Sequence, residues 1–150
     1  MNLQVSSKKN DDAFALKSLI CFNFYRGWRG ISEYYRKSLP PGVSPQQSYI
    51  LEICDMKNGV QVSHIANVLE IDISAISGML RRMELSRLIR REIQSDNRRQ
   101  ILVYLTEDGE ILKKKVIEEM LKADAVLRDS ISQSMIDSLI ETVDRIRELE

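Results

Sequence analysis

Long apolar runs, cysteines and histidines are all scarce in this sequence of 150 residues. No run of about eighteen apolar residues occurs, so we expect no membrane-spanning helix. The polar start MNLQVSSKKNDDAF has no apolar signal core, which favours a cytoplasmic protein. Cys21 and Cys54 are too few for a disulfide framework. They also lack ligand spacing with the single histidine, His64, so we expect no metal site and no cofactor.

The motifs of common enzyme classes are missing as well. The sequence has no G-x-S-x-G nucleophile elbow and no glycine-rich phosphate loop. A Ser-His-Asp triad would need His64, which has no such setting. We therefore expect a protein that is not an enzyme.

Charge is balanced overall but not along the chain. The net charge is zero, yet residues 81–106 hold 7 arginines against 3 acidic residues. Residues 107–150 hold 7 basic and 12 acidic residues. A basic middle in a neutral chain fits the binding of a polyanion, although a solvated, salt-bridged face would give the same count.

The N-terminal part predicts two helices. Apolar residues over 12–38 recur at helical spacing and predict one long helix, which Pro40-Pro41-Gly42 ends. Ser44 and Pro45 then begin a second helix as its N-cap and first residue, and we expect it to run to about Met56.

The C-terminal part also predicts two helices. Thr106 is a good N-cap for a long helix that ends near Asp129. Ser132 or Ser134 begins the last helix, which carries an apolar stripe. The N- and C-terminal stripes have little else to cover them, so we expect dimerisation, although the helices could instead wrap their own core.

Between these ends the pattern changes to short elements. Val60–Val62 predicts a small edge strand, Ser63 caps a short helix over 64–69, and a further helix spans 74–86. Residues 88–94 and 100–105 alternate in hydrophobicity and predict a hairpin. Two helices joined by a tight turn and followed by a hairpin are typical of a winged helix-turn-helix.

The second of those short helices has two distinct sides. We expect its apolar side to pack inward, while the other side presents small residues and arginines. Ala75 could contact a thymine methyl group and Arg81 could pair with guanine. A plain helical hairpin explains this helix equally well by itself. The candidate DNA-reading residues are Ser74, Ala75, Ser77, Gly78, Arg81 and Arg82.

The hairpin tip favours the DNA interpretation. At this tip Arg98 and Arg99 have no hydrophobic core to pack against. They could enter a narrow minor groove of DNA, where the negative potential is enhanced. Contacts to phosphates position a protein on DNA without specifying sequence. The candidates for phosphate contact are Ser63, His64, Arg90 and Arg91.

The stretch VSHIANVLEIDISAISGMLRRMELSRLIRREIQSDNRRQILVYLTEDG closely resembles the MarR family of winged-helix transcriptional regulators. The wing of that family has the pattern Asp-x-Arg, then five residues, then Leu-Thr. Here Asn97 stands where relatives carry an Asp that steadies the wing arginine, with an acid displaced to Asp96. Arg87 stands where the family has Gly before the first wing strand, a position that favours positive φ and costs about 1 kcal/mol without Gly.

The resemblance implies a mainly α fold with a small β-wing. It implies a winged helix-turn-helix lobe over 44–106, flanked by dimerisation helices over 12–38 and 107–150, in one chain of residues 1–150. It further implies a homodimer that binds double-stranded DNA at a palindromic operator, represses transcription, and releases DNA when a small effector or oxidant arrives. The alternative is a winged-helix module for protein–protein assembly without specific DNA binding, which would present a face poor in arginine.

The stretch LICFNFYRGWRGISEYY resembles the Cys-Phe-x-x-Tyr segment of the organic-hydroperoxide-sensing branch. The matching residues are Cys21 with Tyr25, and Tyr35 is one further match. The resemblance implies a redox-sensing thiol held by tyrosines of the partner subunit. Alternatively, Cys21 is a small apolar residue in a helix interface. Trp28, Phe24 and Tyr25 could line a pocket for an aromatic effector, or belong to a core or interface.

Overall fold

The computed structural model describes residues 15–94 and 100–149. Its helices are α2 (Ile20–Ser38), α3 (Pro45–Ile53), α4 (Val62–Leu69), α5 (Ile73–Leu85), α6 (Glu107–Ser130) and α7 (Gln133–Arg147), and its strands are β1 (Val60–Gln61), β2 (Ile89–Ile93) and β3 (Ile101–Leu105). The fold is therefore mainly helical with a small β-wing, as predicted. Among the described residues, no helix is both long and apolar enough to cross a bilayer.

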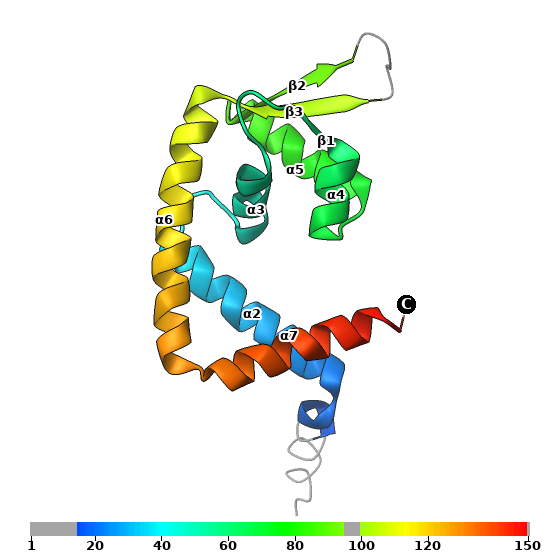
Figure 1. Ribbon diagram of the computed structural model, residues 1–150, viewed down its shortest axis with the longest axis vertical. Coiled ribbons are helices and arrows are strands. Elements are labelled where there is room, and N and C mark those ends of the chain that lie inside the picture. Colours follow the sequence, from blue (N-terminus) through cyan, green and yellow to red (C-terminus); the bar gives the residue numbers. More distant parts are fainter. Residues whose placement is uncertain (1–14, 95–99, 150) are drawn as a thin grey trace, which may run out of the picture.

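The molecule consists of two regions (Figure 1). The sheet, α3, α4 and α5 form a winged lobe, and α6 runs from the sheet to α2 and α7 below it. The hydrophobic core lies in the winged lobe and continues onto the first half of α6. Its fully buried side chains include Ile50, Leu51, Ile65, Ile76, Leu80, Val103, Leu105 and Val116. Cys54 belongs to this core, and burial raises the pKa of its thiol to about 12.

The three strands are antiparallel in the order β1-β3-β2, so β1 is the expected edge strand. Ile89 pairs with Leu105, and both side chains are buried beneath the sheet. Because side chains alternate along a strand, Arg90, Glu92 and Tyr104 lie on the opposite face. This outer face is the upper surface of the wing.

Three of the predicted N-caps form, those of α3, α6 and α7. Ser44 accepts a hydrogen bond from the Gln47 amide at 3.2 Å, and the Gln47 side chain accepts one from the Ser44 amide at 2.9 Å. Thr106 accepts from the Gly109 amide at 3.0 Å, and Ser132 caps α7. Each cap satisfies amides that the first helical turn leaves without partners.

Three sequence predictions were wrong in detail. Residues 15–18 are helical, but Leu19 is extended and separates them from α2, because the Asn23 side chain donates from Nδ2 to the carbonyls of Lys17 and Leu19. Ser63 is not an N-cap, since α4 begins at Val62. Helix α3 ends at Ile53 rather than near Met56, because Cys54 turns extended and is buried. Residues 12–14 lie outside the described part of the chain.

The turn from α5 to β2 has the expected conformation. Arg87 has a φ of 59°, in the left-handed region. Its carbonyl accepts a hydrogen bond from the Thr106 hydroxyl at 2.6 Å. A Cβ added to Gly109 would lie 2.0 Å from the Leu88 carbonyl oxygen. The first turn of α6 and the start of β2 therefore touch backbone to backbone, which only glycine permits.

The lower helices have exposed apolar surfaces. Neither α2 nor α7 contains a buried residue. Their exposed apolar side chains include Ile20, Trp28, Ile31, Met135, Leu139, Ile140, Val143 and Ile146. Tyr34 and Tyr35 join α2 to α6 by donating to the Ala123 carbonyl and the Asp124 carboxylate. Arg147 joins α7 to the winged lobe through an ion pair with Glu70.

Candidate DNA interface

Helix α5 has the two sides that its sequence predicts. Ile76, Leu80 and Met83 are fully buried, and Met79 packs against the core. The six DNA-reading candidates are all exposed: Ser74, Ala75, Ser77, Gly78, Arg81 and Arg82. The structure therefore brings this set to the outside of one helix.

Gly78 has no role in internal packing. A Cβ added there would meet no atom within 4 Å. Glycine inside a helix costs about 1 kcal/mol relative to alanine, so the fold alone would favour a side chain at this position. The neighbouring Ser77 hydroxyl bonds the Ile73 carbonyl at 2.8 Å and adds little bulk. The result is a flat surface on which another molecule can approach the α5 backbone closely.

Within the described part of the chain, the arginines beside this flat surface have no carboxylate partner. Six arginines of the described residues lie within 4.0 Å of a carboxylate: Arg36, Arg90, Arg91, Arg128, Arg145 and Arg147. Arg81, Arg82 and Arg87 have no such partner within residues 15–94 and 100–149. Arginines without carboxylate partners can bind an anion without first giving up an ion pair.

The two arginines of the first wing strand are already engaged. Arg91 donates from Nε to the Glu84 carboxylate at 3.0 Å, and this hydrogen bond lowers the pKa of Glu84. The pair joins the wing to α5. Arg90 forms an ion pair with Glu92, and its guanidinium stacks on Tyr104 at 4.1 Å from the ring centroid. Phosphate contact by these two arginines stays a prediction.

The remaining DNA candidates divide by position. Ser63 and His64 are exposed in the first turn of α4. Asn97, Arg98 and Arg99 lie outside the described residues, so the wing-tip interpretation stays a prediction.

The candidate sensor residues are spread along α2. Cys21 is exposed, and so are Tyr25 and Trp28, at 54% and 47%. Tyr35 lies 14 residues after Cys21, or about 21 Å along one helix, so the two do not meet within a chain. Burial and the hydrogen bond to Asp124 raise the pKa of Tyr35 to about 12.

An open groove of about 730 Å³ is lined by residues that include Phe22, the neighbour of Cys21 in the sequence. It combines two aromatic rings with three cationic side chains, and its lining residues are Lys17, Phe22, Tyr25, Arg26, Arg29, Gly30 and Glu33. Such a lining suits an aromatic anion. Of the aromatic residues expected to line a pocket, Tyr25 lines this groove, whereas Trp28 and Phe24 do not, and sequence reasoning missed the adjacent cations.

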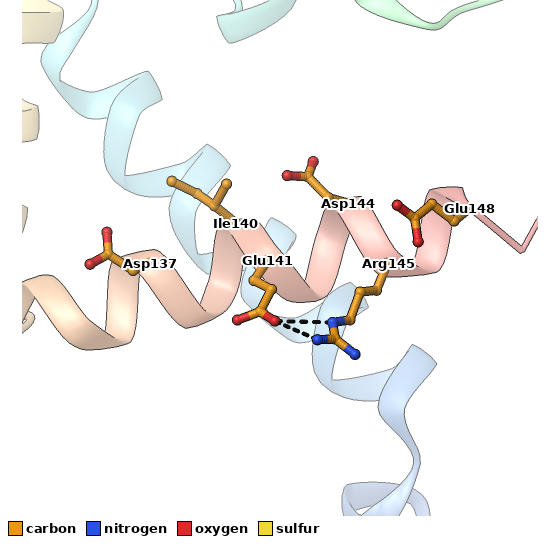
Figure 2. Close-up of a pocket in the computed structure, with 6 residues that line it drawn as sticks. All are labelled: Asp137, Ile140, Glu141, Asp144, Arg145 and Glu148. Atoms are coloured by element: carbon orange, nitrogen blue, oxygen red, sulfur yellow. Dashed lines mark hydrogen bonds and ion pairs between the residues drawn. The ribbon is translucent and has the colours of Figure 1, made fainter.

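Helix α7 carries a second open groove, of about 500 Å³. Its lining includes Asp137, Glu141, Asp144 and Glu148, and Figure 2 shows Glu141 paired with Arg145. An acidic side repels phosphates. Among the described residues, no group of three or more His, Cys, Asp or Glu side chains could hold a metal ion.

Comparison with known proteins agrees with this geometry. The model of the MarR family matches residues 43–101. The HTH-type transcriptional regulator MgrA of Staphylococcus aureus is 24% identical over 144 residues, covering 91% of this chain and 98% of that protein. The organic hydroperoxide resistance transcriptional regulator of Bacillus subtilis is 29% identical over 108 residues, covering 71% and 74%.

Solved structures share the fold. The PcaV transcriptional regulator of Streptomyces coelicolor, in complex with its natural ligand, superposes with a TM-score of 0.80 at 13% identity, covering 89% of this chain and 94% of that one. The transcriptional repressor CouR, bound to a 23-mer DNA duplex, gives 0.76 at 21% identity, covering 88% and 94%. From the motif, the fold and the relatives together, residues 43–101 form a MarR family domain, and the chain resembles HTH-type transcriptional regulators along most of its length.

Proposed function

We propose that this protein is a repressor that binds a palindromic operator as a homodimer and releases it in response to a small effector or an oxidant. The observation that carries the proposal is the outer side of α5. It combines a flat surface at Gly78 with arginines that have no carboxylate partner among the described residues. Small residues let the helix enter the major groove, and free arginines supply the attraction to DNA.

Each part of this surface has a distinct task. Ser74, Ala75 and Ser77 lie near the N-terminal end of α5, where a recognition helix meets base edges. Arg81 can pair with guanine through two parallel hydrogen bonds. Arg82 and His64 are placed for phosphates, which set the register of the protein on the duplex. The wing-tip arginines would add contact in the minor groove.

The homodimer rests on the apolar surfaces of the lower helices. Leu139 and Ile140 of α7 are 54% and 55% exposed, and Ile20 of α2 is 68% exposed. Apolar surfaces of this kind mark interaction sites, and a second copy of the chain offers the same helices. Two-fold symmetry then places two copies of α5 about 34 Å apart, one turn of DNA.

The test is selection of bound duplexes from random DNA, followed by affinity measurements across salt concentrations. We expect a palindromic site, and log K falling with log salt by about 0.9 for each phosphate contacted. A salt slope near zero would exclude DNA binding and would favour the alternative, a module for protein–protein assembly. Binding to duplex DNA without a preferred sequence would contradict the proposed operator but not the proposed DNA interface.

Release is proposed to begin at α2. The Cys21 sulfur can attack one oxygen of an organic hydroperoxide. The O–O bond breaks, the thiol becomes a sulfenic acid, and the peroxide is reduced to an alcohol. An aromatic anion in the neighbouring groove is the other trigger. Adding a hydroperoxide or a phenolic acid to the protein–DNA complex distinguishes the two triggers, because Cys21→Ser should abolish only the response to the hydroperoxide.

A further inference from the structure

The outer face of the wing holds one row of residues across β2, β3 and the residue just before β1. Arg90 on β2 lies directly opposite Tyr104 on β3. Val60 pairs with Val103, so the next position of the same register places Gly59 opposite Tyr104. Arg90, Tyr104 and Gly59 thus form a row that points away from the buried core.

The ring of Tyr104 fills the space that Gly59 leaves. A Cβ added to Gly59 would lie 2.6 Å from both the Cζ and the hydroxyl oxygen of Tyr104, and 2.9 Å from the Cβ of Leu102. Any other residue at position 59 would have to displace the ring. Glycine here is therefore explained by the placement of Tyr104.

That placement in turn holds the guanidinium of Arg90. Its Cζ lies 4.1 Å from the ring centroid of Tyr104, close enough for a cation–π interaction. Stacking uses the face of the guanidinium and leaves its N–H donors free at the edge. Glu92, two residues along the same strand, forms an ion pair with the Arg90 guanidinium and so occupies part of its edge. Both members of the pair remain about half exposed.

We propose that Tyr104 is a positioning residue for DNA binding: it holds the Arg90 guanidinium on the wing surface so that its edge can exchange Glu92 for a DNA phosphate. This inference rests on the proposed function, because it needs DNA at the wing. It assigns Gly59 and Tyr104 a task in binding although neither touches DNA.

A double-mutant cycle tests the proposal, with affinity for a duplex DNA measured at about 0.1 M salt. We expect Tyr104→Leu to weaken binding about threefold to tenfold, while Tyr104→Phe keeps the ring and stays within about twofold of wild type. In an Arg90→Ala background, Tyr104→Leu should cause no further loss. Glu92→Gln should tighten binding, since it frees the guanidinium edge. Thermal unfolding of each variant identifies any that fail to fold.

Gly59→Ala provides an independent route to the same ring. It should weaken binding in the wild-type background and have little effect once Tyr104 is Leu. Equal losses from Tyr104→Leu with and without Arg90 would show a purely structural ring and overturn the proposal. Unchanged binding in Arg90→Ala would overturn it as well. If wild-type protein shows no salt-dependent binding to any duplex, the proposed function itself fails.

Discussion

Two single residues show where folding and binding make opposite demands. Gly78 weakens α5 while touching no other side chain, and Arg87 occupies a left-handed conformation that favours glycine. Backbone choices that reduce stability persist where another requirement keeps them. For Gly78, the proposed close approach of DNA would supply that requirement.

Gly78→Ala should therefore separate stability from binding. We expect the free energy of unfolding to rise by up to about 1 kcal/mol, because alanine is the better helix former. DNA affinity should fall, since a methyl group would protrude from the flat surface. Urea unfolding and a DNA titration of the same sample check both halves, and unchanged affinity would mean that α5 approaches DNA by another side.

Arg87→Gly should stabilise the fold by about 1 kcal/mol, because glycine adopts positive φ without the Cβ penalty. The matched control is Arg82→Gly, the same chemical change inside α5, which should destabilise by a similar amount. Urea unfolding measures both variants. A loss of stability in Arg87→Gly would contradict the left-handed conformation of this turn.

At the scale of elements, the Glu84–Arg91 pair is the connection between α5 and the wing. It is partly buried, with side chains 37% and 29% exposed, and it fixes the strand that leads to the wing tip. The lowered pKa of Glu84 means that the folded state favours the charged carboxylate. This contribution to stability is present above the ordinary Glu pKa of 4.5 and is lost as pH falls through the lowered folded value.

We expect Glu84→Gln to be less stable than wild type at neutral pH, and the difference to shrink as pH falls below 4.5. Denaturant unfolding across this range measures it. In an Arg91→Ala background the pH-dependent difference should disappear. A difference that stays constant with pH would show that the ion pair is not its source.

Local elements were predictable from the sequence to the extent that their determinants are local. Caps at Ser44, Thr106 and Ser132 follow from side chains within three residues, and all three form. The Glu84–Arg91 pair depends on how β2 packs beside α5, which no local pattern encodes. The break at Leu19 is accompanied by two hydrogen bonds from the Asn23 side-chain amide to carbonyls of the preceding turn, which compete with the helical periodicity.

At the scale of the whole molecule, the winged lobe has its own core while α2 and α7 bury no residue. A second copy of the chain would complete the lower region. The stability of a chain that needs its partner depends on protein concentration.

Leu139→Glu, which places a charge on the apolar stripe of α7, should shift the proposed dimer toward monomer. The matched control is Ile93→Glu on β2, since Ile93 is also exposed, at 66%, but lies on the wing. Sedimentation across a range of concentrations distinguishes them. A dimer that Leu139→Glu leaves intact would place the subunit interface elsewhere.

The contact between Gly109 and Leu88 has a mechanical consequence. Because the two backbones touch with no side chain between them, little free movement separates α6 from the strand that leaves α5. A tilt of α6 must therefore displace Leu88 and, through the hydrogen bond from the Leu88 amide to the Met83 carbonyl, the last turn of α5. Any event that bends α6 thus changes the orientation of α5, the helix proposed to read DNA, because the contact leaves little free movement to absorb the bend.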